Sequence, residues 1–562
     1  MKKILLSLFA VCVMLAANAQ AYQWASQIEG TSHDQSLSVS SIGTDIYSTG
    51  SFTSSTDLDP SSGTLSFTSN GDHDVYIQKL DENGNFLWGK TVGGTGNDFG
   101  RMINDYGTHI IISGTFQDSV DFNPGTPTHF KTSNGGYDVF VLALDANGDF
   151  LWVNTFGGTG NDAFGGQEKD GNDDLVITGG FTYDMTVDVA GTPTTITSAS
   201  GDKTDVFFME IDLSGNLSWI SSIGGTGINA GRGVAIKANN HMLFSGRYRN
   251  IMDANPGTGT FSLSSVGGYS IYLLELDAQG DFVNAFSIDN AADMETYDME
   301  LDANENIYLT GFYKGTADFD MKSGMDSRTS NGDQDSYVVK YTPNKDLVWA
   351  KTFGSSGLEQ SLGVEVSANG DVYTVGRYSD VTDFDPNTGV VNHTAVGPSY
   401  DMYFHKLDST GNFEWVHTYG NIDNDIARGL EIDPDGNVYV SGSFAYDIDF
   451  DPTTGIDSLV TDGSRDAVLL KFSDVSVGVN DIAPQNKTAI KIYPNPVQNQ
   501  LFFELDNEEI TGITIIDFSG RVVQSIANTT AQSVNVSNLV RGIYVLRIST
   551  KNGMRTNRFI KQ

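Results

Sequence analysis

Five arginines are the side chains of this sequence best suited to bind a ligand, because basic residues are scarce in it. The 562 residues include 32 Lys and Arg against 71 Asp and Glu, a net charge of −39. Arg101, Arg232 and Arg428 take one equivalent position in a repeated segment, and Arg247 and Arg377 share another. Guanidinium groups bind carboxylates through paired hydrogen bonds. We predict an anion-binding site for a carboxylated or sulfated glycan or an acidic peptide; the alternative is ion pairing with adjacent acidic loops.

A second recurring pattern, Asp-x-Asp or Asp-x-Asn, could bind Ca²⁺, which prefers about six to eight oxygen ligands. The alternative is an Asx-Pro turn, in which the side-chain oxygen accepts from nearby backbone amides. Weaker copies of the pattern occur at Asp253-Ala254-Asn255-Pro256 and Asp318-Phe319-Asp320. Calcium is the one cofactor we consider, and its candidate ligands are Asp57, Asp59, Asp121, Asn123, Asp318, Asp320, Asp383, Asp385, Asp449 and Asp451.

Catalytic patterns are weak. The single cysteine, Cys12, lies in an expected signal peptide, so the mature chain offers no thiol as nucleophile, metal ligand or disulfide partner. The eight histidines take non-equivalent repeat positions, and no Gly-x-Ser-x-Gly elbow joins a strand to a helix. Paired carboxylates could hydrolyse glycosides, but acidic residues are too frequent for spacing to single out a pair. We expect no enzymatic activity and assign no catalytic residue.

The elements that position these residues follow from the tryptophans. They are Trp24, Trp88, Trp152, Trp219, Trp349 and Trp415, at steps of 64, 64, 67, 130 and 66 residues. The 130-residue step is two periods with one tryptophan missing near Asn284. A period of this kind indicates a propeller or a solenoid. The recurring tryptophan is best explained as packing between neighbouring repeats.

Each repeat carries four strand-like segments bounded by Gly, Asn and Asp, which is typical of a β-meander. In the last repeat the first two are 427–432 and 437–444, and the third, 466–472, follows a loop of about 20 residues. That repeat lacks its fourth strand, whereas the first repeat is preceded by an orphan strand, residues 22–28. If the orphan completes the last repeat, seven blades close into a ring without a free sheet edge. We predict a seven-bladed β-propeller over residues 20–472.

The repeat resembles a bacterial β-propeller repeat family. The matching motifs are Gly84-Asn85-Phe86-Leu87-Trp88, Gly93-Gly94-Thr95-Gly96-Asn97-Asp98 and Gly436-Asn437-Val438-Tyr439-Val440-Ser441-Gly442. The resemblance covers roughly residues 22–472 and implies the fold. It implies little about function, because propellers host hydrolases, lyases, lectins and scaffolds.

Residues 1–19 have the pattern of a secretory signal peptide. Lys2 and Lys3 precede an apolar run at 4–15, and Ala17-Asn18-Ala19 forms a cleavage site. The run is shorter than the ~20 residues of a transmembrane helix, and no later segment replaces it. Residues 20–472 hold about 21 Lys and Arg against 64 Asp and Glu. This acidity argues against nucleic acid as a partner.

The C-terminal residues 490–562, after a linker at 473–489, form a separate small β-sandwich in our reading. They resemble the type A C-terminal sorting domain of the type IX secretion system of Bacteroidetes. The residues that carry this resemblance are Tyr493, Pro494, Asn495, Pro496, Gly520, Arg521, Gly542, Tyr544 and Lys561. The resemblance implies export by the type IX machinery, usually followed by removal of the domain and by release or attachment to surface lipopolysaccharide.

These patterns together favour a secreted or surface-attached binding or adhesion module for a glycan or a surface protein. A structural surface or matrix protein without a small ligand is the second possibility. A polysaccharide-active hydrolase or lyase is the third.

Overall fold

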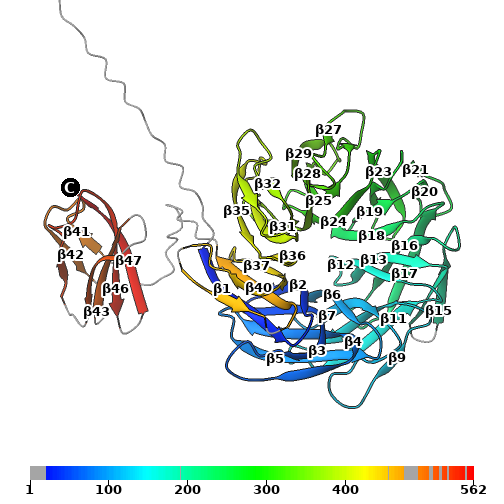
Figure 1. Ribbon diagram of the computed structural model, residues 1–562, viewed down its shortest axis with the longest axis horizontal. Helices are drawn as coiled ribbons and strands as arrows, with labels where there is room; N and C mark the ends of the chain where they lie inside the picture. Colours follow the sequence, from blue (N-terminus) through cyan, green and yellow to red (C-terminus); the bar gives the residue numbers. More distant parts are fainter. Residues whose placement is uncertain are drawn as a thin grey trace, which may run out of the picture. The chain divides into compact units, whose positions relative to one another are not determined.

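In the described residues of the computed structural model all regular elements are β-strands, which confirms the prediction of an all-β protein (Figure 1). The structure describes residues 21–189, 192–453, 455–461, 463–473, 491–504, 510–517, 522–527, 531–550 and 553–562. The expected signal peptide and nearly all of the expected linker lie outside these residues. The chain divides into two compact units, residues 1–476 and 477–562.

The larger unit repeats one antiparallel arrangement of four strands, here called a repeat sheet. The first strands of the repeat sheets are β2 (Gln35–Ile42), β6 (Phe99–Asp105), β12 (Ala163–Lys169), β18 (Ala230–Ile236), β24 (Met294–Leu301), β30 (Glu359–Val366) and β36 (Ile426–Ile432). The second strands are β3 (Asp45–Asp57), β7 (Ile110–Phe116), β13 (Leu175–Thr182), β19 (Met242–Tyr248), β25 (Ile307–Tyr313), β31 (Val372–Tyr378) and β37 (Val438–Phe444).

The other two strands complete each repeat sheet. The third strands are β4 (Ser66–Asp81), β10 (Asp138–Leu144), β16 (Thr204–Ile211), β22 (Ser270–Leu276), β28 (Asp335–Tyr341), β34 (Asp401–Leu407) and β40 (Asp466–Ser473). The fourth strands are β5 (Phe86–Gly94), β11 (Phe150–Gly157), β17 (Leu217–Gly225), β23 (Phe282–Asn290), β29 (Leu347–Phe353), β35 (Phe413–Tyr419) and the N-terminal β1 (Ala21–Gly30), which pairs with β40.

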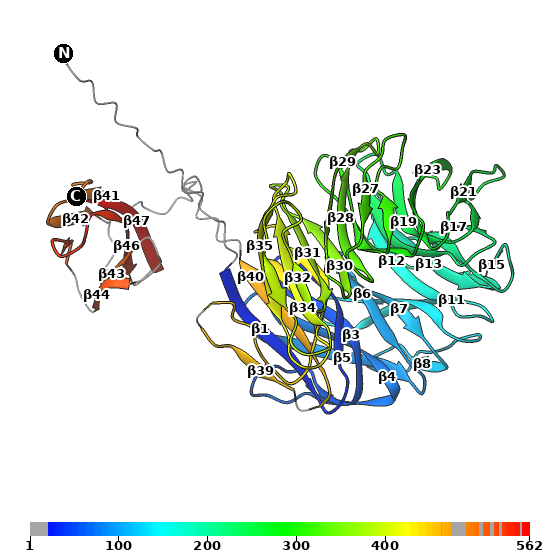
Figure 2. The same ribbon diagram turned by 45° about the horizontal axis from the view of Figure 1, so that its top comes forward.

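The repeat sheets of the larger unit lie around a common centre, with their first strands nearest to it (Figures 1 and 2). Neighbouring first strands contact one another in chain order, and β36 also contacts β2. At the periphery, a fourth strand pairs briefly with the next repeat sheet, as β5 does with β8 and β1 with β3. We call each such junction a seam.

The sequence predicted loops without regular structure between the second and third strands, but the structure contains strands there. Most of them contain short hairpins, namely β8 (Ser119–Asp121) with β9 (Phe130–Thr132), β14 (Asp184–Val189) with β15 (Thr192–Thr197), β20 (Ile251–Asp253) with β21 (Ser262–Ser264), β26 (Thr316–Asp318) with β27 (Ser327–Thr329), β32 (Val381–Asp383) with β33 (Asn392–Thr394), and β38 (Asp447–Asp449) with β39 (Ser458–Val460). These hairpins are too short and too polar for their periodicity to be visible in the sequence.

Burial explains why many second and third strands do not alternate between exposed polar and buried apolar residues. All residues of β7, β10, β22 and β37 are buried, because these strands have a neighbour on each side and a sheet packed on each face. The fourth strands are less covered; in β5, for example, most residues are half-buried and one is exposed. The core therefore consists of apolar layers between adjacent repeat sheets.

The recurring tryptophans lie at the seams, as the periodicity predicted. The indole Nε1 of Trp88 donates to the carbonyl oxygen of Ala146 at 3.2 Å, in the next repeat sheet. A Cβ placed on Gly148 would lie 3.2 Å from the same indole, and one on Gly84 would lie 3.1 Å from Trp24. These glycines have φ angles of +76° and +79°. Glycine therefore serves both the hairpin turn and the close approach of the indole.

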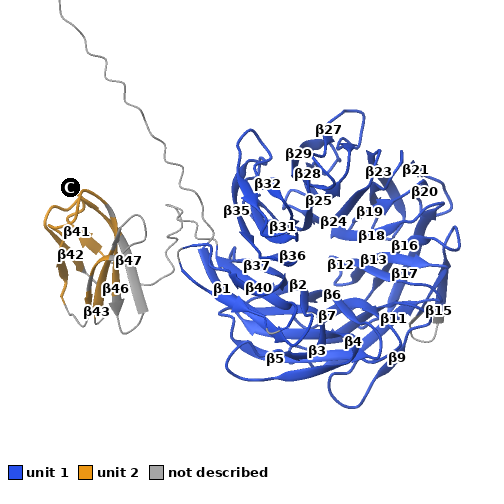
Figure 3. Ribbon diagram, in the orientation of Figure 1, with its two compact units in different colours: residues 1–476 blue, residues 477–562 orange. Residues whose placement is uncertain are grey.

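The smaller unit consists of two antiparallel sheets (Figure 3). The first contains β41 (Lys491–Tyr493), β42 (Gln500–Glu504) and β45 (Ser533–Asn535), and the second contains β43 (Ile510–Asp517), β44 (Val522–Ala527), β46 (Gly542–Thr550) and β47 (Gly553–Lys561). Leu501 and Phe503 of the first sheet share one buried cluster with Ile513 and Leu546 of the second.

Candidate functional site

A β-bulge in every first strand builds the candidate site. The pairing of each first strand with its second strand skips a position, as between Gly100 and Met102 in β6 or between Ala427 and Gly429 in β36. A bulge leaves a residue outside the ladder and re-aims its side chain. The skipped residues include Leu37, Arg101, Gly165, Arg232, Tyr297, Leu362 and Arg428, and all seven line one cavity of about 580 Å³. We call them the bulge ring.

The bulge ring places three of the five predicted arginines in one cavity. Phe99, Tyr137 and Phe164 add aromatic walls. The cavity size lies in the range of small-ligand sites, roughly 300–1,000 Å³. The sequence-based alignment of Arg101, Arg232 and Arg428 thus corresponds to a real juxtaposition in space.

Two arginines of the ring lack a compensating carboxylate. No ion pair joins Arg101 or Arg428 to an acidic side chain of the described residues, and the Nε of Arg428 is buried without a hydrogen-bond partner there. Burial, with the nearby charges of Arg377 and Arg101, lowers the pKa of Arg428 to about 10. Burial and the charge of Arg232 lower the pKa of Arg101 as well. Such an arrangement favours binding of an anion.

Arg232 and Arg247 form ion pairs, which was the alternative to a free anion-binding site. Both guanidinium groups pair with the carboxylate of Glu295. The Nε of Arg232 lies 3.1 Å from Oε1 of Glu295, and Nη1 of Arg247 donates to Oε2. Only 2% of Glu295 is exposed, whereas about 30% of each arginine side chain is. Burial lowers the pKa of Arg232, but Glu295 outweighs it and the net shift is upward. One carboxylate therefore neutralises part of the arginine cluster.

The last predicted arginine, Arg377, has a neutral partner. Its Nε donates to Oε1 of Gln360 at 2.9 Å, and its guanidinium lies 4.7 Å from the ring centre of Tyr400. Arg247 lies over Tyr269 in the same way, at 4.4 Å. Neither arginine lines the cavity of the bulge ring. Both stand one strand further out, where their guanidinium groups are held against aromatic faces.

One further arginine of this region, Arg465, was not identified from the sequence. Arg465 directly precedes β40, at the repeat position that Tyr137, Tyr269 and Tyr400 occupy. Its Nη1 lies 3.2 Å from Nε2 of His33, and its Nη2 lies 3.9 Å from a carboxylate oxygen of Asp423. The replacement of tyrosine by arginine at an aligned position was the signal that could have revealed it.

Beyond the bulge ring the first strands carry carboxylates. The same seven ring residues line a second cavity of about 270 Å³, together with Glu168, Glu300, Glu365 and Glu431. Each glutamate stands three residues after a ring residue. Burial, followed by repulsion from neighbouring carboxylates, raises the pKa of Glu300 to about 8. The same causes also raise the pKa of Glu365. The interior therefore carries arginines at the level of the bulge ring and carboxyl groups, whose charge is suppressed by burial, three residues further along the first strands.

The Asp-x-Asp/Asn loops have the contacts of Asx turns. In the first loop, Oδ1 of Asp57 accepts from the backbone amides of Asp59 at 3.0 Å and Leu65 at 2.7 Å. Asp121, Asp318, Asp383 and Asp449 accept from two amides in the same way. Their partners Asp59, Asn123, Asp320, Asp385 and Asp451 each accept an amide two residues on. Within the described ranges, no group of three or more His, Cys, Asp and Glu could hold a metal ion.

Most of the predicted sorting residues of the smaller unit lie next to its C-terminal strand. Asn495 accepts from the amide of Ile560 at 2.8 Å and donates to the carbonyl of Arg558 at 3.1 Å. Tyr493 stacks on Phe502, and the hydroxyl of Tyr544 donates to the carbonyl of Val540. Pro494 and Pro496 flank Asn495, Gly542 begins β46 and Lys561 ends β47. Gly520 and Arg521 lie outside the described residues.

Residues 491–562 match the family described as the secretion system C-terminal sorting domain. This confirms the predicted sorting domain. The domain implies export through the type IX secretion system, contact with its machinery, and a secreted or cell-surface location. Within the described part of the chain, no helix has the length and hydropathy needed to cross a membrane.

The chain is also similar to other proteins. It is 23% identical over 500 residues to an uncharacterized WD repeat-containing protein of Acanthamoeba polyphaga mimivirus, covering 75% of this chain but 35% of that relative. A Bacteroides caccae protein of unknown function matches at 10% identity and TM-score 0.24, covering 51% of this chain and 92% of that one. An extracellular domain of a two-component system of Bacteroides thetaiotaomicron matches at 9% identity and TM-score 0.20, covering 96% and 98%. These TM-scores establish no common fold.

Proposed function

We propose that the larger unit is a seven-bladed β-propeller that acts as a non-catalytic binding module outside the cell. The pairing of the N-terminal β1 with β40 supports closure of the ring by that strand. The contacts of each first strand with the next, and of β36 with β2, support the circular order. The similarity to a WD repeat-containing protein of mimivirus also supports the proposal, because WD repeats form propeller blades.

Within this module, the arginine face of the bulge ring binds an anionic group of a glycan, a carboxylate or a sulfate. The observation that carries this proposal is the buried, unpartnered Nε of Arg428 beside Arg101 in a cavity of about 580 Å³. The buried Nε of Arg428 leaves a polar requirement that a bound anion would satisfy, and the exposed guanidinium of Arg101 adds a second positive charge beside it.

The cavity walls favour a glycan over an acidic peptide. Phe99, Tyr137 and Tyr297 line the cavity together with the arginines, and the guanidinium of Arg101 already lies over the ring of Phe99 at 4.7 Å. Sugar rings present an apolar face and hydroxyl groups, so they can use an aromatic wall and the charged groups together.

The test is binding of the full chain to a glycan array that includes uronic-acid, sulfated and neutral oligosaccharides, followed by calorimetry on the hits. We expect binding of acidic glycans that weakens with salt. The double variant Arg101→Gln, Arg428→Gln should weaken it at least about tenfold, a loss of about 1.4 kcal/mol. The control Arg328→Gln removes an arginine already paired with Asp326 and should leave binding unchanged.

Three outcomes would contradict the proposal. One is the absence of any acidic glycan among the ligands, and another is unchanged affinity in the double variant with its fold intact. Preferential binding of a poly-glutamate peptide would reassign the site to acidic peptides. Turnover of a bound polysaccharide would instead favour the hydrolase or lyase alternative.

A further inference from the structure

The residues that directly precede the third strands extend the arginine cluster beyond the cavity of the bulge ring. Tyr137, which lines that cavity, precedes β10, and Arg465 precedes β40. The carbonyl oxygen of Tyr137 accepts from the amide of Asp162 at 2.7 Å, and that of Arg465 accepts from the amide of Asp34 at 2.8 Å. Because these backbone contacts are equivalent, Arg465 takes, where the last repeat sheet meets the first, the place of an aromatic wall residue.

The ends of the second strands offer the same comparison. Thr115 of β7 lines the cavity, and Arg377 takes the equivalent position in β31. The Nε of Arg377 donates to Gln360, and its guanidinium lies over Tyr400. Among the residues that the structure describes, no acidic side chain forms an ion pair with Arg377. This arginine is therefore held in position by neutral groups and keeps its charge available.

Arg465 also keeps an unmet polar requirement. Its Nε is buried and has no hydrogen-bond partner within the described ranges. Its Nη1 lies beside His33, whose pKa is lowered to about 4 by burial, so this imidazole is neutral at pH 7. Asp423 lies 3.9 Å from Nη2, but 46% of its side chain is exposed and solvent screens the pair. Burial lowers the pKa of Arg465 although Asp423 and Asp425 act in the opposite direction.

Arg428 connects these two arginines to Arg101. Burial, followed by the charges of Arg377 and Arg101, lowers the pKa of Arg428 to about 10, and the charge of Arg465 acts in the same direction. The first strands contact one another in the order β30, β36, β2 and β6. The repeat sheet of Arg377 thus lies on one side of Arg428, and that of Arg101 lies on the other. Uncompensated positive charge therefore extends to both sides of Arg428.

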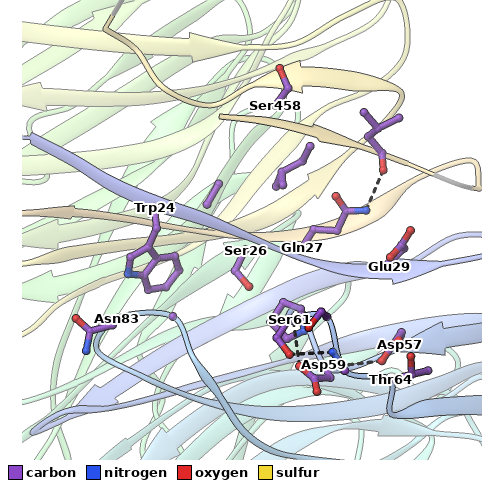
Figure 4. A pocket seen from close by; sticks show the side chains of 17 residues that line it. Trp24, Ser26, Gln27, Glu29, Asp57, Asp59, Ser61, Thr64, Asn83 and Ser458 are labelled. Atoms are coloured by element: carbon purple, nitrogen blue, oxygen red, sulfur yellow. Dashed lines mark hydrogen bonds between the residues drawn. The ribbon is translucent and has the colours of Figure 1, made fainter. Parts of the chain in front are cut away.

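A polar groove at the seam of β1 shows the opposite condition (Figure 4). Gln27 donates there to the carbonyl oxygen of Val460 at 2.9 Å, and Asp57 accepts turn amides. Among the described residues that line this groove, no buried polar atom lacks a hydrogen-bond partner. The buried Nε atoms of Arg428 and Arg465 distinguish the arginine cluster from such a groove.

We propose that the arginine cluster binds an oligosaccharide that carries acidic groups on at least two of its sugar units. Arg101 and Arg428 bind one acidic group, and Arg377 and Arg465 bind the other. Guanidinium groups bind carboxylate or sulfate through paired hydrogen bonds, and two such contacts on one ligand reinforce each other. Binding of the first acidic group is the function proposed above, on which this proposal rests; the second group defines the class of glycan.

The test compares, by calorimetry on the full chain, galacturonate, trigalacturonate and trigalacturonate with methyl-esterified carboxyl groups. We expect trigalacturonate to bind at least about tenfold more tightly than galacturonate, more than the roughly threefold statistical gain from three equivalent acids. The esterified trimer should lose this gain, because it keeps the sugar rings but not the charges. A disaccharide with one or two sulfate groups forms a parallel series, and the series that shows the gain identifies the acid.

Two variants test the second pair of arginines. Arg465→Tyr introduces the tyrosine that three other repeats have at this position, and Arg377→Ser introduces the serine of the first and last repeats. Each variant should weaken binding of the trimer at least about fivefold and binding of the monomer much less. The control Arg328→Gln removes the same charge from an arginine already paired with Asp326, and it should change neither affinity.

Equal affinities for ligands with one and with several acidic groups, in both series, would overturn the proposal and leave the single anion site in place. A gain that survives esterification would overturn it as well, and so would folded variants that bind the trimer like the natural chain. If no acidic sugar of either series binds, the anion-binding function itself fails. That result differs from a loss of the gain alone.

Discussion

At the scale of single residues, Glu295 controls how many arginines are available to a ligand. It is almost completely buried and accepts from both Arg232 and Arg247. Removing one member of a buried ion pair costs more than the pair contributes, because the remaining charge is left desolvated. The arginines are partly exposed, so solvent reduces this cost.

Replacing Glu295 with glutamine should therefore destabilise the protein by about 2 kcal/mol, measured by urea unfolding. It should also tighten binding of acidic glycans, because two more guanidinium groups lose their carboxylate. The matched control is Glu414→Gln. Lys406 lies 3.0 Å from Glu414 but also 2.8 Å from Asp371, so it keeps a partner and little stability is lost. Equal losses in the two variants would contradict this account.

The positions of the cavity arginines could be predicted from sequence, whereas their partners could not. Alignment of the repeats placed Arg101, Arg232 and Arg428 at one position. The bulge at that position directs all three side chains into the same cavity. Pairing of Arg247 with Glu295 depends on a carboxylate in a different strand, 48 residues away. Such contacts arise from the register of neighbouring sheets, which one sequence does not reveal.

At the scale of elements, neighbouring repeat sheets contact each other where a tryptophan indole of one sheet packs against a glycine turn of the next. Gly148, at φ +76°, allows Trp88 to approach its backbone closely, and the indole donates to Ala146. The period of the tryptophans and the Gly-Asn turns could be recognised in the sequence. The stem of Lys90, which like the indole of Trp88 packs against Gly148, could not be recognised, because long polar side chains usually indicate an exposed face.

Gly148→Ala should cost about 2 kcal/mol or more in the free energy of unfolding, since it adds both left-handed strain and a steric conflict with Trp88. Gly107→Ala is the matched control. Its φ angle is +80°, yet nothing lies within 4 Å of the added Cβ. The control should lose only about 1 kcal/mol. Similar losses by chemical denaturation would show that the indole contact contributes little.

At the scale of the whole molecule, buried carboxylates recur around the larger unit. Burial raises the pKa of Asp34, Asp98, Asp162 and Asp425 to about 7 each. Each of them precedes a first strand and accepts at least one backbone amide of a neighbouring segment; Asp98, for example, accepts from Gly94 at 2.8 Å and Gln117 at 3.1 Å. The same position in another repeat is Asn229, so a neutral side chain fits there.

These shifts predict how stability depends on pH. A carboxyl pKa raised on folding means that the folded state binds more protons, so stability falls as pH rises through about 7. The melting temperature should therefore be higher at pH 6.5 than at pH 8.5. Below pH 6.5 the trend should weaken, because burial lowers the pKa of His33 and His417 to about 4 and of His405 to about 3. Those histidines bind protons only on unfolding, which favours the unfolded state in acid.

Calorimetry of the natural chain and of Asp98→Asn at fixed ionic strength would separate local titration from general repulsion. The net charge of −39 also destabilises the folded protein at high pH. Asp98→Asn removes one titrating group while leaving almost all of that charge in place. The variant should therefore show a smaller difference in melting temperature between pH 6.5 and 8.5 than the natural chain. An identical difference would mean that Asp98 is already ionised in the folded protein at neutral pH, with the amides of Gly94 and Gln117 outweighing its burial.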